Sequence, residues 1–402
     1  MTSDTRQDEA MGPVITPTIG AAYSGPVNSL NLLRLCLACT VIVTHCIGLG
    51  YRRTDVILGF TTPATLAVYG FFGISGYLIA RSASDLSPGR FLWHRFLRIF
   101  PAFWVCLIIT ALLFGLIGWI HWSHPCGTAC YYKAPSDPWS YISRNVWLKM
   151  NQLTIPGTLH TVSYWAVWNG SLWTLFYEFL CYLAIGFLAV IGLLRRPIAL
   201  LAVAVGVWLA EVLITSVPAW NANFTGYHWW DETKMLTFLP VFLAGSIIYV
   251  HREKIPDSGW LAAGCVGLMF LFYLVPLGNG DVSFTLTRSD LSAPLLAYPM
   301  LWLGIHLPWP KIGARNDYSY GMYIFGYPIA QVLILWNVNH WGYVPYTIMT
   351  LLITAGFAMA SWWLIERNAL RLKNVGAGPR RAKVAPQPLY PVGELAEPPG
   401  DR

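Results

Sequence analysis

Apolar blocks of about twenty residues recur along this chain of 402 residues, from Leu30 to residue 366. A helix of about that length crosses the hydrocarbon core of a bilayer. The composition agrees, since 55% of the residues are apolar and 11% are charged, against about a quarter charged in an average soluble protein. One soluble domain cannot bury that much apolar surface. The sequence therefore predicts an all-α fold, a polytopic transmembrane helix bundle. It excludes a disordered chain, a nucleic-acid-binding domain and a small disulfide scaffold.

The blocks predict about ten spans without an internal repeat of the solenoid kind. The expected spans are residues 30–50, 57–80, 99–120, 168–192, 198–216, 235–250, 260–277, 291–307, 320–337 and 345–366. The bundle as a whole covers 30–370, and its longest outer loop is 121–167. We expect a polar, flexible tail without a signal peptide at 1–29, and a disordered tail rich in Pro and Gly at 371–402.

The positions of Lys and Arg predict that both termini are cytoplasmic. With this orientation, 18 of the 26 basic residues fall in cytoplasmic segments and seven in outer loops, while Arg34 lies inside the first span. Such a bias toward the cytoplasmic side sets the orientation of membrane proteins. The pair Arg52 and Arg53, directly after the first span, is the exception.

Two ionisable residues in the first span, Arg34 and His45, are candidates for function. They are eleven residues apart, so they share one helix face and are separated along it by ~16 Å. Ionisable residues are costly in a membrane and suggest a functional site. On this interpretation Arg34 binds an anion and His45 acts as an acid, base or nucleophile. The alternative is that Arg34 snorkels to the interface and His45 only packs.

A second basic group precedes the third span. It contains Arg90, His94, Arg95 and Arg98, of which Arg95 and Arg98 are neighbours on a helix. One interpretation is a phosphate clamp, because each guanidinium offers a planar fork of donors. The other is an anchor of the positive-inside kind that contacts lipid phosphates.

The remaining polar candidates lie in the second and fourth spans. Glu178 is a lone carboxylate among aromatic residues, so it must be protonated or paired. It either orients an imidazole or forms a structural ion pair. Ser75 and Tyr77 flank Gly76 at a position that permits a helix break or close helix packing. A catalytic Ser75 is the alternative, although no His and Asp at a recognisable spacing support a serine nucleophile. Glu366 is either an interfacial anchor or a site carboxylate.

No motif for binding nucleotide phosphates or metal is present, and we expect no metal site. His121 and His124 lie close to Cys126 and Cys130 in the long outer loop, but this cluster is an improbable metal site. A disulfide between Cys126 and Cys130 remains an open question.

Six segments, in this order, resemble the motifs of the acyltransferase-3 family of integral membrane acyltransferases. They are NLLRLCLACTVIVTHC, FFGISGYLI, RFLRIFPAFW, GSLWTLFYEFLCY, DYSYGMYIFGYPI and SWWLIE. Together they cover residues 28–370. Many relatives have a His after the late YGxY block, where this chain has Gly326 and Tyr327, so no late catalytic His is carried over. Some relatives carry an esterase-like domain after the bundle, and we expect no such second activity here.

The resemblance implies an acetyl-CoA-dependent O-acetyltransferase that moves an acyl group, usually acetyl, from cytoplasmic acyl-CoA to a carbohydrate hydroxyl. The acceptor would be a polysaccharide, a lipopolysaccharide or a lipid-linked sugar of the cell envelope, and the bacterial inner membrane is the expected location. Arg34, Arg95 and Arg98 would bind CoA, and His45 would be the catalytic base or carry the acyl group. Glu178 would pair with that imidazole, and Ser75, Tyr77 and Trp173 would line the channel or stabilise an oxyanion.

Two other functions fit the same residues less well. A proton-coupled secondary transporter or flippase of a polar, glycan-like solute would also bury Arg, His and Glu. It would not need a clamp for an anion as large as CoA. A non-enzymatic membrane scaffold would tolerate His45→Ala without loss.

Overall fold

The computed structural model describes residues 17–23, 28–51, 61–122, 127–133, 137–159, 167–216, 234–274, 291–313 and 315–375. Within these ranges the chain forms helices and loops, with an isolated β-bridge between Thr18 and Pro256. The predicted all-α fold is confirmed for this part of the chain.

Within the described ranges, six helices are long and apolar enough to cross a membrane. They are α2 (Leu30–Tyr51), α3 (Pro63–Asp85), the continuous helix Pro88–His121, α7 (Trp173–Val190), α8 (Pro197–Ser216) and the continuous helix Tyr343–Asn374. Shorter apolar helices are α10 (Lys234–Val250), α11 (Gly259–Leu274), α13 (Ala297–His306) and α14 (Ser319–Leu335). Each predicted span contains one of these helices. The number of ten spans and the cytoplasmic position of both termini stay predictions.

The third helix begins earlier than expected. Its first segment, α4 (Pro88–Ile109), starts eleven residues before the predicted span, with Pro in its first turn. It continues through the π-helical turn η1 (Thr110–Phe114) into α5 (Gly115–His121). A second π-helical turn, η6 (Trp362–Glu366), joins α15 (Tyr343–Ser361) to α16 (Arg367–Arg371). The basic turns before residue 99 therefore belong to the same rigid helix as the apolar segment.

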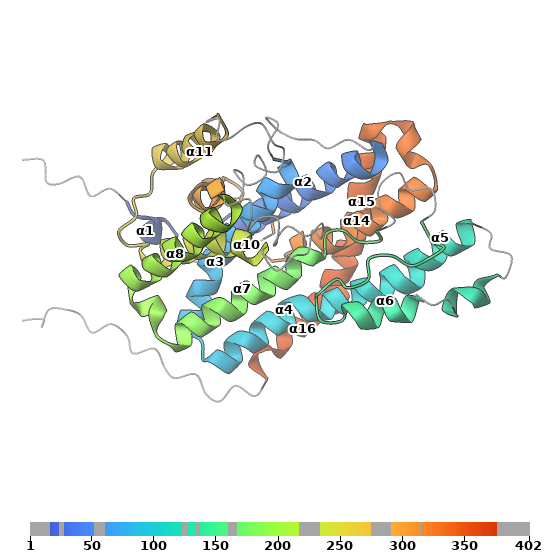
Figure 1. Ribbon diagram of the computed structural model, residues 1–402, viewed down its shortest axis with the longest axis horizontal. Coiled ribbons are helices and arrows are strands. Elements are labelled where there is room, and N and C mark those ends of the chain that lie inside the picture. The colour runs from blue at the N-terminus through green and yellow to red at the C-terminus, as the bar shows by residue number, and fades with distance from the viewer. Residues whose placement is uncertain are drawn as a thin grey trace, which may run out of the picture.

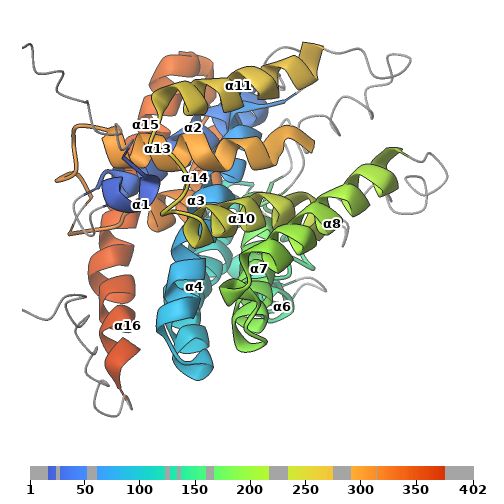
Figure 2. The ribbon, with the colours of Figure 1, turned by 90° about the vertical axis from the view of Figure 1, so that its left-hand side faces the viewer.

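Helix α3 occupies the middle of the bundle and contacts α2, α7 and α10 (Figure 1). Helix α14 packs between α2 and α15, and all of its residues are buried. Helices α4 and α7 run side by side, and α16 lies against the first turns of α4 (Figures 1 and 2). The two helices that carry Arg34 and Arg98 are thus held by the central helices α3, α7 and α14.

Part of the predicted flexible N-terminal tail is ordered. The short helix α1 (Ile19–Ala22) sits at the end of α10, where the Ile19 amide donates to the Ile255 carbonyl at 3.0 Å. Burial of the Ile19 side chain, which is 0% exposed, accounts for this order.

The long loop 121–167 is not structureless. It contains the 3-10 turn η2 (Thr128–Tyr132) and α6 (Pro138–Asn145). Cys130 is disulfide-bonded, while Cys126, His124, Arg52 and Arg53 lie outside the described residues.

Glycine lets α3 and α10 approach each other closely. A Cβ on Gly76 would lie 2.0 Å from the Phe242 carbonyl oxygen, and one on Gly245 would lie 2.1 Å from that of Gly73. The Ser246 hydroxyl donates to the Gly76 carbonyl at 3.1 Å across the same contact. Of the two interpretations of the segment Ser75–Tyr77, the structure favours close helix packing, since α3 is uninterrupted there.

We expect Gly76→Ala to lower the thermal unfolding temperature of the detergent-purified protein and its yield in membranes. The added methyl group must push the backbones of α3 and α10 apart, at a cost of about 1–3 kcal/mol or more. The matched control is Gly206→Ala in α8, where no atom lies within 4 Å of the added Cβ. That variant should be neutral or slightly stabilising. Equal stability of the two variants would contradict the close contact.

Candidate active site

The side chains of Arg34 and Arg98 meet at one carboxylate, that of Asp317. Arg34 Nη1 donates to Asp317 Oδ2 at 2.8 Å, and Arg98 Nη2 donates to the same oxygen. The other oxygen, Oδ1, accepts from the Ser319 hydroxyl at 2.5 Å and from its amide at 3.2 Å. All the hydrogen-bonding capacity of this carboxylate is thus directed at α2, α4 and the first turn of α14.

Glu366 completes this network from η6. Its Oε2 accepts from Arg98 Nη1 at 3.4 Å, and its Oε1 accepts from the Ser361 hydroxyl at 3.0 Å. The side chains of the four charged residues are between 3% and 18% exposed. Two guanidinium groups therefore face two carboxylates in a nearly dry setting, and their charges balance. We call Arg34, Arg98, Asp317 and Glu366 the inner ion network, because they lie at the end of the bundle predicted to be cytoplasmic.

Arg95 differs from its neighbour Arg98. Its guanidinium lies over the rings of Phe91 and Tyr182, at 5.9 and 5.8 Å from their centroids. Among the described residues it forms no ion pair, and its buried Nε has no hydrogen-bond partner. The same holds for Nε of Arg90, one turn earlier on α4. Of the three predicted CoA-binding residues, Arg95 is the one that forms no ion pair with a described carboxylate.

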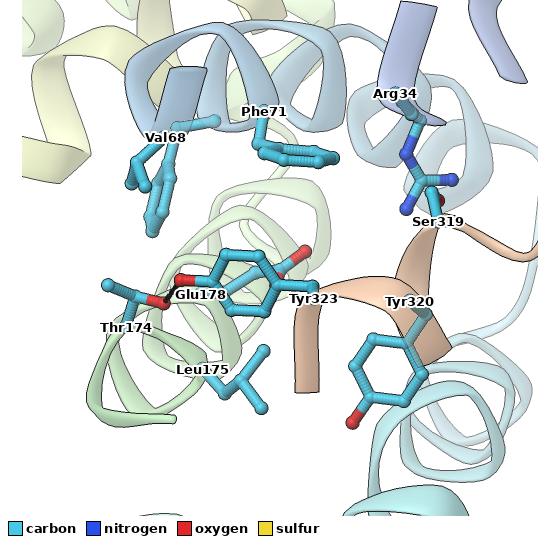
Figure 3. A pocket seen from close by; sticks show the side chains of 10 residues that line it. Arg34, Val68, Phe71, Thr174, Leu175, Glu178, Ser319, Tyr320 and Tyr323 are labelled. Carbon is cyan, nitrogen blue, oxygen red and sulfur yellow. Dashed lines mark hydrogen bonds between the residues drawn. The ribbon is translucent and has the colours of Figure 1, made fainter. Parts of the chain in front are cut away.

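A small cavity lies beside the inner ion network and extends toward the middle of the bundle (Figure 3). It is lined by Arg34 and Ser319 at one end and by Phe71, Thr174 and Tyr323 at the other, with Glu178 on its wall. The hydroxyls of Thr174 and Tyr323 hydrogen-bond to each other at 2.5 Å and connect α7 to α14. The volume is about 40 Å³, which is enough for a water molecule.

His45 lies beyond the Thr174–Tyr323 pair. Its half-buried imidazole has Nδ1 at 3.4 Å from the Ser171 hydroxyl oxygen, and its ring meets that of Tyr327 edge-on at 5.0 Å. Tyr327 is one helical turn after Tyr323 on α14, so His45 is about 6 Å farther along the bundle than the Thr174–Tyr323 pair.

Ser171 is itself held in place by Asn169. The Ser171 amide donates to Asn169 Oδ1 at 3.1 Å, and the Asn169 side-chain amide donates to the Ile324 carbonyl at 2.8 Å. The segment that leads into α7 is thereby fixed to α14 beside His45.

The predicted pairing of Glu178 with the imidazole is not among the hydrogen bonds of the described residues. The Glu178 carboxylate instead accepts from the Tyr182 hydroxyl, one turn along α7. Glu178 and Ser171 are seven residues apart, about 10 Å along a helix, which accounts for the separation.

The other predicted channel residues form no hydrogen bond or ring contact with His45 among the described residues. Tyr77 is 1% exposed and packs edge-on against the rings of Tyr23 and Tyr249. Ser75 is buried on α3, and neither residue lines the cavity beside the inner ion network. Trp173 lines a different and larger cavity, together with Lys149.

Three residues of this region were not predicted as site residues from the sequence. Asp317 is the first residue of the DYSYG segment, and Ser171 and Asn169 surround the start of the SLW segment. One signal in the sequence could have identified Asp317. It is a carboxylate at the edge of an apolar block, and other blocks contain Arg residues that need a partner. Nothing in the spacing pointed to Ser171.

Comparisons with known proteins identify the family of the chain. The profile of an acyltransferase domain matches residues 27–363, so the chain belongs to the acyltransferase-3 family of membrane acyltransferases. It is 29% identical over 356 residues to a Shigella phage Sf6 protein named O-acetyl transferase, covering 85% of this chain and 96% of that protein.

A second relative is Nodulation protein 10 of Rhizobium leguminosarum bv. viciae, which is 27% identical over 371 residues, covering 87% of this chain and 95% of that protein. No solved structure matches. The predicted family is confirmed, and the chain is an acyltransferase with several apolar helices suited to a membrane. The family match gives no support to the transporter or the scaffold.

We expect Asp317→Asn to destabilise the protein by about 3–5 kcal/mol, because it leaves two buried guanidinium groups facing a neutral amide. Thermal unfolding in detergent measures the loss. Glu253→Gln is the matched control, since this carboxylate is 67% exposed and its pair with Arg252 is at the surface. A loss below about 1 kcal/mol in Asp317→Asn would show that the network does not hold the helices together.

Proposed function

We propose that this acyltransferase moves an acyl group, in the first instance acetyl, from cytoplasmic acyl-CoA to a hydroxyl of a carbohydrate in the cell envelope or secreted from the cell. We further propose that it works in a bacterial inner membrane. The observation that carries the proposal is the position of His45, on the same face of α2 as Arg34 and beyond a cavity that starts at the basic end of the bundle. The name of the phage relative, O-acetyl transferase, supports oxygen as the accepting atom.

The proposed acyl-CoA donor fits the positive charge of Arg95, which forms no described ion pair at the basic end of the bundle. CoA carries a phosphorylated ribose and a pyrophosphate, and guanidinium groups bind such anions through charge-assisted hydrogen bonds. Arg95 is available for this contact, with Arg90 beside it on α4. Arg34 and Arg98 contribute less, because Asp317 and Glu366 already balance their charge. The acyl arm would extend along α2 toward His45.

The proposed chemistry uses the imidazole of His45 as a general base. With its Nδ1 proton donated to Ser171, the lone pair on Nε2 is free to take the proton of the acceptor hydroxyl. The hydroxyl oxygen then bonds to the thioester carbonyl carbon, the carbon–sulfur bond breaks, and the CoA thiolate takes the proton back from His45. In the alternative route Nε2 attacks the thioester carbonyl carbon, and the carbon–sulfur bond breaks to release the CoA thiolate. The acceptor oxygen then bonds to the acyl carbon and displaces the imidazole, and the proton of the acceptor hydroxyl passes to the thiolate.

Acetyl-CoA at about 100 times its Kd should stabilise the detergent-purified protein by about 2.7 kcal/mol. Arg95→Ala should remove this stabilisation and lower the unfolding temperature without ligand less than Arg98→Ala does, since Arg95 has two ring contacts but no described ion pair. Arg98→Ala should lower that temperature even without ligand.

The control for this measurement is Arg196→Ala. Arg196 is also a basic residue of a predicted cytoplasmic segment, but its side chain is exposed. Its response to acetyl-CoA should match that of the wild type. Full stabilisation of Arg95→Ala by acetyl-CoA, or none of the wild type at millimolar acetyl-CoA, would contradict the proposed donor site.

We propose Ser171 as a positioning residue for His45. Ser171→Ala should lower kcat by up to about 100-fold, because the imidazole loses the partner that sets its orientation and tautomer. The KM for acetyl-CoA should change little, and Ser171→Thr, which keeps the hydroxyl, should recover part of the rate. Ser143→Ala in the exposed part of α6 is the control. A raised KM with an unchanged kcat would assign Ser171 to donor binding instead.

A further inference from the structure

A second cavity, of about 310 Å³, lies on the side of α7 away from the inner ion network. Its wall consists of the aromatic and aliphatic side chains of Trp173, Phe176, Tyr177 and Leu180, together with Met150 and Met235. Its volume is at the lower end of the range for small-molecule sites. A cationic residue, Lys149, stands at its edge.

The cavity continues into an apolar stripe along α7. Phe176, Leu180, Leu183 and Phe187 recur at helical spacing on one face, and Leu183 and Phe187 are 39% and 63% exposed. From Phe176 to Phe187 the stripe measures ~16 Å. A single apolar chain could therefore lie along α7 with one end in the cavity.

Lys149 is presented by a rigid loop. Asn145 and Gln152 close this loop, since the Asn145 side-chain amide donates to the Gln152 carbonyl at 2.7 Å and the Gln152 amide donates back to Asn145 Oδ1 at 3.0 Å. The Trp104 indole fixes the loop to α4 through the Val146 carbonyl at 2.9 Å. Such bonds hold the backbone of the loop that carries Lys149 beside the cavity.

The residue before Lys149 is under backbone strain. Leu148 has φ of +69° and is 0% exposed. A bulky residue adopts this conformation only when its surroundings impose it, and such strain gathers at ligand-binding sites.

Lys149 forms no ion pair with any described residue. A second basic residue, Lys234, directly precedes Met235 of the cavity wall. The cavity edge is therefore positively charged, while the cavity wall and the stripe along α7 are apolar. A molecule with an anionic head and an apolar chain would complement both the charged edge and the apolar surface.

We propose that this groove binds an amphiphile with a single apolar chain and a phosphate head, the chain along α7 and the phosphate at Lys149. Trp173 is two residues from Ser171, so the head of the bound molecule lies near the segment that holds His45. An amphiphile bound there is suitably placed to carry the hydroxyl that accepts the acyl group. The binding itself does not depend on the proposed acyl transfer, so either can fail without the other.

The test is native mass spectrometry of the full-length protein in detergent, titrated with farnesyl phosphate. The wild type should bind one molecule. Lys149→Gln should weaken this binding about tenfold, the expected loss of a charged hydrogen bond, and Lys149→Arg should retain it. Leu180→Trp, which fills the cavity, should also lose binding, whereas Lys133→Gln, at an exposed cation of the same loop region, should bind as the wild type does.

Farnesol, which lacks the phosphate, distinguishes the contribution of the apolar stripe to binding from that of Lys149. It should bind more weakly than farnesyl phosphate, and Lys149→Gln should not weaken it further. The proposal is overturned if Lys149→Gln binds farnesyl phosphate as the wild type does. It is also overturned if phosphatidylglycerol, with two chains, competes as well as farnesyl phosphate, since the groove would then be an ordinary lipid contact.

Discussion

The carboxylate of Asp317 holds the basic end of this bundle together. Arg34 of α2 and Arg98 of α4 repel each other, and only a shared anion allows both to be buried at one point. Glu366 adds the charge that balances the second guanidinium. These bonds fix α2 against α4 and α14. They therefore also fix the position of His45 along the bundle, since His45 is eleven residues farther along α2. The geometry at the imidazole thus depends on an ion network ~16 Å away.

Between this network and His45 the structure is closed. The Thr174–Tyr323 hydrogen bond crosses from α7 to α14, and the cavity on its inner side has room for little more than a water molecule. The arm of an acyl-CoA that reaches His45 along α2 would have to part these two side chains.

The sequence predicted the helices well, because long apolar blocks allow few alternatives in a membrane. It placed Arg34 and His45 on one face of a helix, where Arg34 lines the cavity beside the inner ion network and His45 lies beyond the Thr174–Tyr323 pair. The hydrogen-bond and ion-pair partners of these residues were harder to predict from the sequence. Arg95 and Arg98 are alike in the sequence, yet a carboxylate 219 positions away distinguishes them. Glu178 was expected at the imidazole, but helix α7 directs it toward Tyr182, and the nearer Ser171 has no signature in its spacing. Contacts between distant segments decide each of these roles, and periodicity cannot predict them.

The most direct measurement follows the acyl group itself. Membranes that contain the protein and its native carbohydrates would be mixed with acetyl-CoA labelled in the acetyl group, and the label would be counted in the carbohydrate fraction. His45→Ala should lower this transfer by about 100-fold or more, the usual contribution of a general base, in protein that still unfolds at the wild-type temperature. Transfer by His45→Ala at the wild-type rate would contradict the role of His45. Absence of label from the carbohydrate of the wild-type sample would contradict the proposed reaction.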